Sequence, residues 1–333
     1  MHVPLWGWLV FGGIVAVMLT VDLIAHRRAH VIGFRESAIW SAIWVAVSLL
    51  FAVALGLTLG GGAAVDFTTA YLLEKSLSVD NLFVFALIFG YFQVPRAYQH
   101  RALFFGVIGA LVFRGIFLAA GVALVSKFTA ILFVFGAILI WSAVKLVRDS
   151  DDTVDPGTSL AVRLLRKVMP VSDTYSGAKF VVREAGKRVA TPLLAVVAAI
   201  EAADLMFAVD SVPAVLAVSD EAFIVYSSNA FAILGLRALY FMLSGMLARF
   251  HHLGKGLAFI LAFIGAKLFL QAGHKLVSPS IPEIPSLLSL GVIVVALTVA
   301  VVASLRRPLP PDEDDDDTPE LAVSPAPRPA AAR

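Results

Sequence analysis

Long apolar runs dominate the chain, and short segments between them carry most of the charged residues. A helix needs roughly 20 apolar residues to cross the hydrocarbon core of a bilayer. Nine runs come near that length and are predicted to be membrane-spanning helices, at 4–25, 37–58, 67–91, 102–125, 128–147, 191–218, 222–248, 255–275 and 286–305. The pattern therefore predicts an all-α polytopic membrane protein.

The loops between these runs differ in positive charge. Lysine and arginine in short loops favour the cytoplasmic side of a membrane. With the N-terminus outside, the outer loops keep only Lys127 and Lys275, and the inner loops hold a much larger basic set, including Arg27, Arg28, Arg35, Arg96, Arg101 and Arg148. The asymmetry predicts an N-out, C-in orientation.

Composition agrees with a membrane protein and excludes several other classes. Hydrophobic residues make up 59% of the 333 residues and charged residues 15%, against roughly 25% charged in a soluble domain. The chain has no cysteine, which excludes disulfides, thiolate metal sites and cysteine nucleophiles. Basic loops without interleaved aromatic residues give no indication of nucleic-acid binding.

The nine runs divide the chain into six segments. Residues 1–58 form two N-terminal spans, 59–147 a first three-helix repeat, 148–190 a cytoplasmic connector, 191–275 a second repeat, 276–305 a last span and 306–333 an acidic, Pro- and Ala-rich cytoplasmic tail. The composition of the tail predicts disorder. In the connector, 159–169 is predicted to be a basic amphipathic helix on the inner leaflet. Residues 179–189 are predicted to be a small hairpin.

Two stretches place carboxylates inside apolar sequence. Glu201, Asp204 and Asp210 lie in one, and Glu74 and Asp80 lie in the other. A charge at bilayer depth costs at least about 2.5–3.5 kcal/mol, so such residues indicate function. Alignment of residues 79–81 with 209–211 also superimposes Glu74 on Asp204. We interpret the two stretches as halves of one site.

The similarity between the halves extends beyond the carboxylates. Each acidic span is followed by a span with one arginine, Arg114 or Arg237, and then by a span with a lysine, Lys145 or Lys267. A unit of three crossings inverts its second copy, and transporters with inverted repeats bind ions near the midplane where the repeats meet. The repeat predicts that Asp80 and Asp210 approach each other.

Helical spacing groups most of the polar residues. At 100° per residue, two stripes are predicted, one of Glu74, Ser78 and Asn81 and one of Glu201, Asp204 and Ser211. Asp80 and Asp210 fall off these stripes if the helices are regular. Because Pro213 cannot donate a backbone hydrogen bond, we expect local unwinding at 209–211 that turns Asp210 inward.

These side chains form a predicted ligand set for a metal ion, with no catalytic residue. The expected ligands are Glu74, Asp80, Asn81, Glu201, Asp204 and Asp210. Ser78 and Ser211 would add hydroxyl groups, and the thioether of Met206 could favour Mn²⁺. Hard oxygen ligands suit Mg²⁺, Ca²⁺ or Mn²⁺. Carboxylates that lose a cation in a desolvated site can take up protons instead, which predicts cation/proton exchange.

The basic residues inside the spans have a predicted supporting role. Arg114, Arg237 and Lys267 could pair with the acids and keep an empty site neutral. Asp22 and Asp66 lie near span ends, where interfacial solvation is expected to suffice. Lys75 could neutralise Glu74 or point outward, and the sequence leaves both open.

Several motifs resemble signature blocks of the TerC family. They are Glu74-Lys-Ser-Leu-Ser-Val-Asp-Asn, Gly186-Lys-Arg-Val-Ala-Thr-Pro192 and Asp204-Leu-Met-Phe-Ala-Val-Asp-Ser-Val-Pro213, in a resemblance that covers residues 20–305. The resemblance implies a bacterial multipass inner-membrane protein related to the LysE-type transporter superfamily. Family members are associated with manganese export, tellurium-resistance gene clusters, alkaline-pH response and metal supply to exported enzymes. The family's intramembrane acids match Glu74, Asp80, Glu201, Asp204 and Asp210.

Three functional classes follow from these observations. The first is a non-enzymatic exporter of a hard divalent cation, for which the resemblance implies Mn²⁺. Its partners would be the lipid bilayer, the metal ion and protons. No bound cofactor is expected.

The second class is a membrane scaffold for tellurium response, metal stress or exoenzyme metallation, which would act through the connector 148–190. The third is an intramembrane aspartyl protease with Asp80 and Asp210 as a dyad. The glycine-rich context of known members does not follow either aspartate, which disfavours the protease.

Overall fold

The computed structural model describes residues 3–25, 33–148, 160–172, 174–184, 187–244 and 253–306. The predicted disordered tail beyond Arg306 and the acidic beginning of the connector lie outside these residues. So does the side chain of Asp80, although its backbone belongs to a helix.

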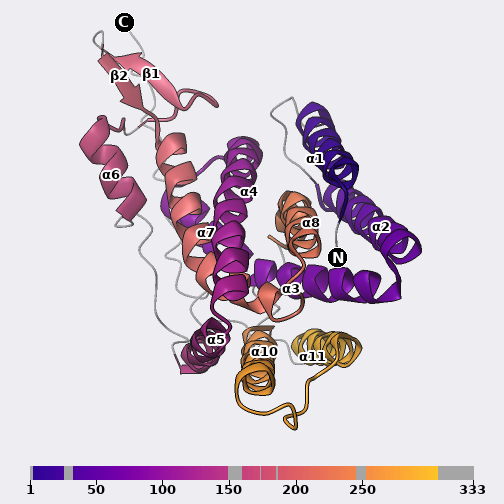
Figure 1. Ribbon diagram of the computed structural model, residues 1–333. Coiled ribbons are helices and arrows are strands. Elements are labelled where there is room, and N and C mark those ends of the chain that lie inside the picture. The colour runs from indigo at the N-terminus through magenta and orange to yellow at the C-terminus, as the bar shows by residue number, and fades with distance from the viewer. Residues whose placement is uncertain are drawn as a thin grey trace, which may run out of the picture.

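The architecture is helical, as predicted, with one small hairpin (Figure 1). The first five helices are α1 (Leu5–Ala25), α2 (Phe34–Leu59), α3 (Gly61–Tyr91), α4 (Arg96–Lys127) and α5 (Ile131–Arg148). The connector contributes α6 (Leu160–Val168), β1 (Val181–Glu184) and β2 (Lys187–Ala190). The remaining helices are α7 (Pro192–Leu216), α8 (Ala222–Leu234), α9 (Leu236–Leu243), α10 (Leu253–Leu276) and α11 (Ser286–Arg306).

Eight candidate spans are long and apolar enough to cross a membrane in the part of the chain that the structure describes. They confirm eight of the nine predicted spans, with α8 and α9 together making one of them. The ninth is α3, which has the length but carries Asp66, Glu74, Lys75 and Asp80 within its 31 residues. That α3 crosses the bilayer remains a prediction.

Helix α3 lies across the middle of the molecule and packs against α2, α7, α8 and α11 (Figure 1). Its Phe67 and Tyr71 belong to an apolar core shared with α1, α2 and α8. Ala70 and Leu73 belong to a second core shared with α5, α7 and α10. Because the helix is covered on several sides, Glu74, Ser78 and Asn81 are buried within the protein.

The helices pair in a way that relates the two predicted repeats. Helix α4 packs against α7, α3 packs against α8, and α5 packs against α10. In the predicted repeat, α3 corresponds to α7, α4 to α8 with α9, and α5 to α10. The α4–α7 and α8–α3 pairs are then equivalent, as a twofold axis between the repeats would make them. The inversion of the second repeat and the N-out orientation both stay predictions.

The expected unwinding near Asp210 is wrong. Helix α7 continues without a break from Pro192 to Leu216 and includes Pro213. The proline lies in the last turn of the helix, so its missing amide removes a single hydrogen bond, the one to the carbonyl of Val209, and the helix ends three residues later.

The helix break falls elsewhere, at Gly235 between α8 and α9, where the sequence predicts one span. There Lys75 Nζ donates to the carbonyl of Ala232 at 3.3 Å. A Cβ atom on Gly235 would lie 2.7 Å from Lys75 Nζ. A partly buried ammonium group therefore occupies the space at the break and satisfies one carbonyl at the end of α8.

The described part of the connector confirms both predicted elements. Helix α6 buries Val162 and exposes Leu164 and Val168 beside its basic residues. It lies with β1 and β2 at one end of the molecule, next to the beginning of α7 (Figure 1). Tyr175 Oη donates to the carbonyl of Phe92 at 2.7 Å, which attaches the connector to the turn after α3.

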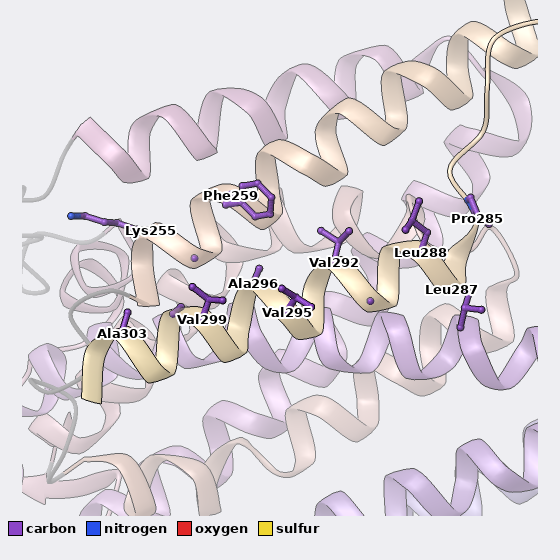
Figure 2. Close-up of a pocket in the computed structure, with 13 residues that line it drawn as sticks. Lys255, Phe259, Pro285, Leu287, Leu288, Val292, Val295, Ala296, Val299 and Ala303 are labelled. Carbon is purple, nitrogen blue, oxygen red and sulfur yellow. The ribbon is translucent and has the colours of Figure 1, made fainter. Parts of the chain in front are cut away.

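An apolar groove of about 1050 Å³ runs between α10 and α11 (Figure 2). Apart from Lys255 at one end, its lining side chains are aliphatic or aromatic, such as Phe259 and Val295. The groove offers no oxygen-rich ligand set for an ion, so the candidate site lies elsewhere.

Candidate functional site

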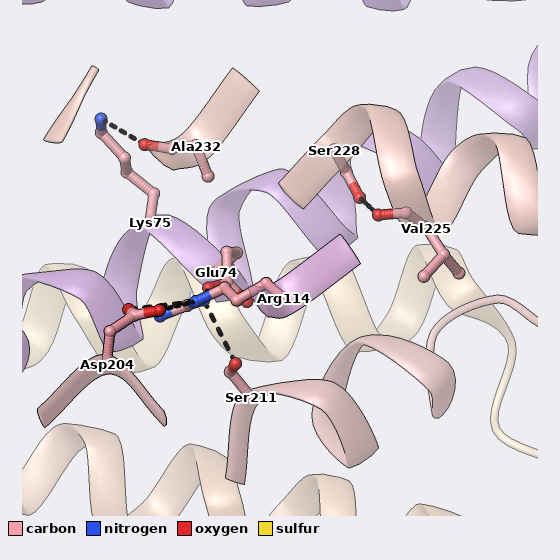
Figure 3. A network of polar contacts seen from close by, with 8 residues as sticks. All are labelled: Glu74, Lys75, Arg114, Asp204, Ser211, Val225, Ser228 and Ala232. Carbon is pink, nitrogen blue, oxygen red and sulfur yellow. Dashed lines mark hydrogen bonds and ion pairs between the residues drawn. The ribbon is translucent and has the colours of Figure 1, made fainter. Parts of the chain in front are cut away.

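The candidate site is organised around the guanidinium group of Arg114 on α4 (Figure 3). Its Nη2 lies 2.9 Å from Asp204 Oδ1, and Nε donates to both oxygens of the same carboxylate at 3.2 Å. Nη1 forms an ion pair with Glu74 Oε1. All three side chains are buried. One arginine thus joins the carboxylates of α3 and α7.

Two further polar side chains complete the contacts of Arg114. Nη1 donates to Ser211 Oγ at 3.2 Å. The amide oxygen of Asn81, when turned toward the guanidinium, accepts from Nη2 at 3.3 Å, while its nitrogen donates to the carbonyl of Leu77. Glu74 aligns with Asp204 in sequence, and Asn81 aligns with Ser211. Positions that align between the two acidic stretches therefore contact the same guanidinium group.

The charge balance of this cluster is unusual for a membrane interior. A buried ion pair is favourable only when geometry and hydrogen bonds compensate for desolvation. Arg114 supplies a planar fork of donors that suits carboxylates. It contacts two carboxylates, so with all three groups ionised the cluster carries a net negative charge.

Asp210 faces a different space, off the stripe of Asp204 and Ser211 as the spacing predicts. It accepts a hydrogen bond from Ser142 Oγ of α5 at 2.6 Å. It lines a cavity of about 450 Å³ together with Leu77, Asn81, Trp141, Ser142, Lys145, Leu146, Met206, Phe207, Val209, Ser211, Leu257 and Leu261. Asn81 and Ser211 contact both Arg114 and this cavity, so they separate the buried cluster from the more accessible Asp210.

Glu201 lies one helical turn before Asp204 on α7 and packs against a glycine of α4. A Cβ atom on Gly109 would overlap the carboxylate of Glu201. Glu201 Oε2 is buried, and no described group hydrogen-bonds to it. A buried carboxylate oxygen without a hydrogen bond lowers the stability of the fold, so its presence indicates a functional role for Glu201.

The other predicted residues of the site have mixed positions. Ser78 is buried, and its hydroxyl has no hydrogen-bond partner among the described groups. Met206 is 52% exposed on the cavity wall. The predicted approach of Asp80 to Asp210 involves a side chain outside the described residues, although Asn81, next to it, does reach the cavity with Asp210.

Two of the three predicted supporting cations do not bind these carboxylates. Arg237 forms an ion pair with Asp22 of α1 and also donates to the backbone oxygen of Asp22 at 3.0 Å. Lys267 Nζ donates to Ser289 Oγ of α11 at 3.1 Å. The expectation of a solvated Asp22 is also wrong, because α1 packs on the bundle and buries it.

Lys75 adjoins Glu74 in sequence but points away from Arg114, toward Ala232 (Figure 3). It is therefore not the counter-ion of Glu74. Sequence reasoning also missed Ser142 and Lys145 on α5 as cavity residues. The signal for these was weak, since an isolated serine or lysine near a span end is common in membrane helices.

In the described conformation the acids are organised around arginine rather than around an ion site. Among the described residues, no three His, Asp or Glu side chains gather closely enough to hold a metal. The oxygen ligands nevertheless have the right chemistry for a hard cation. Arg114 occupies the ligands that such a cation would need.

Comparison with known proteins agrees with this architecture. An uncharacterized membrane protein of Myxococcus xanthus is 40% identical over 315 residues, which cover 94% of this chain and 96% of that protein. The "Putative membrane-bound redox modulator Alx" of Escherichia coli K12 is 43% identical over 299 residues, covering 87% and 90% of the two chains. No solved structure matches the chain.

The family comparison covers most of the bundle. The sequence profile described as "Integral membrane protein TerC family" matches residues 59–308, which include both acidic spans and the helices that pack around Arg114. The multipass helical architecture and the relatives agree with this match. The chain belongs to the TerC family of integral membrane proteins.

Proposed function

We propose that the chain exports a hard divalent cation across the bacterial inner membrane in exchange for protons, and that this cation is Mn²⁺, as the family resemblance implies. The observation that carries the proposal is the convergence of aligned polar residues from two helices on Arg114, beside a cavity that contains Asp210. An ion pair that only stabilises the fold does not require an adjoining cavity that carries further polar side chains such as Asp210 and Ser142. A transport site does, because its ion must enter and leave.

The geometry suggests how cation and arginine would alternate. Glu74 and Asp204 are held by Arg114 when no metal is present, which avoids two unpaired carboxylates in a low-dielectric interior. A divalent cation that reaches Asp210 through the cavity would compete with Arg114 for the same oxygens. Protons would replace the cation on return, since a desolvated carboxylate accepts a proton more readily than an exposed one.

The second candidate function is redox modulation, which the printed name of the Escherichia coli relative indicates for that protein. The present chain contains no cysteine, so it cannot exchange thiols and disulfides through its own side chains. An effect on redox state would have to be indirect. Control of the cellular content of a redox-active metal is one such route and agrees with the export proposal.

The test is Mn²⁺ uptake into inside-out vesicles driven by an imposed pH gradient. We expect Asp204→Asn and Asp210→Asn to reduce the rate at least about tenfold, because each removes a charged ligand of the bound ion. Asp220→Asn is the matched control, since Asp220 is exposed and lies 3.9 Å from Lys275. Equal rates in all four proteins would refute transport through this site and leave the scaffold function of the connector.

A further inference from the structure

The connector hairpin has an unfavourable arrangement of charge. Arg183 on β1 lies directly opposite Arg188 on β2 in the antiparallel register. Directly opposed side chains share one face of the hairpin, with Cβ atoms about 4.5–5.5 Å apart, and like charges there destabilise the pair. The hairpin therefore keeps two guanidinium groups together at a cost in stability.

These arginines line a pocket that is open to solutes and rich in donors. The pocket has a volume of about 520 Å³ and is lined by Ser176, Lys179, Val181, Val182, Arg183 and Arg188. Its three cations form no ion pair with any carboxylate in the part of the chain that the structure describes. Among the described residues, the side chains thus present positive charge and a hydroxyl group with no carboxylate paired to them.

The chemistry of this lining selects an anion with several oxygens. Guanidinium groups bind phosphate through paired hydrogen bonds, and a lysine adds a point charge. A tetrahedral phosphate can accept donors from several directions at once, which suits cations that come from both strands and from the preceding loop. The cavity is several times larger than a phosphate ion, so it has room for an organic group beside the phosphate.

We propose that the hairpin pocket binds the phosphate group of a phosphoester between Arg183, Arg188 and Lys179. Two kinds of molecule carry such a phosphate group, an anionic phospholipid in the membrane and a phosphoester in solution. Helix α6 lies at the same end of the molecule and exposes Leu164 at 52% and Val168 at 84% beside basic residues. Such a helix binds the surface of an anionic membrane, which would place headgroups near the pocket.

The pocket is coupled by the chain to the helix of the candidate site. Strand β2 leads through Thr191 directly into α7, which carries Asp204 and Asp210. Thr191 Oγ1 donates to the carbonyl of Lys179 at 2.7 Å. A bound phosphate would therefore hold the loop, the hairpin and the beginning of α7 together. The proposed phosphate site does not depend on the proposed export of a metal ion.

The test measures the melting temperature of the purified full-length protein in phosphate-free detergent buffer, with two probes. One probe is glycerophosphate, and the other is phosphatidylcholine nanodiscs with or without phosphatidylglycerol. We expect at least one phosphate probe to raise the melting temperature of the wild type. We expect Arg183→Gln/Arg188→Gln to bind that probe at least about tenfold more weakly. The double variant Arg166→Gln/Lys167→Gln removes the same charge from α6 and should bind glycerophosphate within about twofold of the wild type. Its response to phosphatidylglycerol is not used as a control, because the basic residues of α6 contribute to membrane binding.

A separate readout distinguishes binding from a structural role. Without probe, Arg188→Gln should melt at or above the temperature of the wild type, because it removes the repulsion with Arg183. A lower melting temperature would show that the arginines stabilise the hairpin themselves and would overturn the proposal. Protection by phosphatidylglycerol alone would identify the headgroup as the ligand, and protection by glycerophosphate would identify a soluble ester.

Two other outcomes would also refute a phosphoester site. The first is an equal response of the wild type and of Arg183→Gln/Arg188→Gln to both probes. The second concerns the acidic run at 312–317. If deletion of 308–333 lowers the melting temperature as much as the double variant does, and neither probe binds, the pocket holds the acidic tail of the same chain.

Discussion

Arg114 is the residue on which the two halves of the site depend. Its guanidinium group contacts Glu74, Asp204 and Ser211, which come from two helices and from positions more than 100 residues apart. Arginine suits this position because it stays charged and donates in several directions within one plane. Lysine would offer one compact charge and could not serve both carboxylates with the same geometry.

We expect Arg114→Met to destabilise the protein by about 3–5 kcal/mol, because removal of one member of a buried ion pair leaves the partner charge uncompensated. Thermal unfolding in detergent would measure the effect. Lys145→Met is the control, since Lys145 is exposed on the cavity rim. The triple variant Arg114→Met/Glu74→Gln/Asp204→Asn should recover much of the loss, since no buried charge is then left unpaired. An unchanged melting temperature of Arg114→Met would contradict this account.

Among the elements, the interrupted pair α8 and α9 differs most from what a continuous apolar run predicts. The interruption coincides with Gly235 and with the approach of Lys75 from α3. A lysine inside the bundle needs an acceptor for its ammonium protons, and the end of α8 offers the carbonyl of Ala232. We therefore expect the break and the partly buried lysine to stabilise each other.

This relation predicts coupling between Gly235 and Lys75. We expect Gly235→Ala to lower the melting temperature. The new Cβ would lie 2.7 Å from the present position of Lys75 Nζ and would push the ammonium group away from the carbonyl of Ala232. Gly115→Ala on α4 should have little effect, since a Cβ there meets no atom within 4 Å. In Lys75→Met, a flexible and uncharged side chain can move aside, so Gly235→Ala should cost less in that background. Additive effects of the two substitutions would argue against the coupling.

At the scale of the whole molecule, the crossing of α3 decides the topology. If α3 spans the membrane, the loops after α2 and after α4 lie on the same side, and the end of α5 lies on the other. If α3 does not span it, the loops after α2 and α4 lie on opposite sides. The charged residues within α3 argue against a crossing. Its packing against α2, α7, α8 and α11 argues for one, because these helices shield α3 from lipid.

The absence of native cysteine allows a direct test with single cysteines at Gly61, Lys127 and Arg148. We expect a membrane-impermeant maleimide to label Gly61→Cys and Lys127→Cys in intact cells. Arg148→Cys should react only after permeabilisation, as the basic loops indicate. The wild type provides the unlabelled control. Labelling of Gly61→Cys without Lys127→Cys would show that α3 does not cross.

Much of this architecture could be predicted because membrane insertion depends on local composition. A run of apolar residues identifies a span wherever it occurs, and a carboxylate within it stands out. The alignment of Glu74 with Asp204 and of Asn81 with Ser211 also came from local spacing, and the structure brings all four residues to Arg114.

The sequence by itself therefore determined the helical membrane class, most span positions and the polar stripes of the two acidic helices. Only the tertiary structure decided which cation meets which acid. Arg114 and Arg237 hold matching places in the two predicted repeats, yet Arg114 binds Asp204 and Arg237 binds Asp22. Such pairs join segments 90 and 215 residues apart. No periodicity along the chain encodes them, because they depend on how whole helices pack.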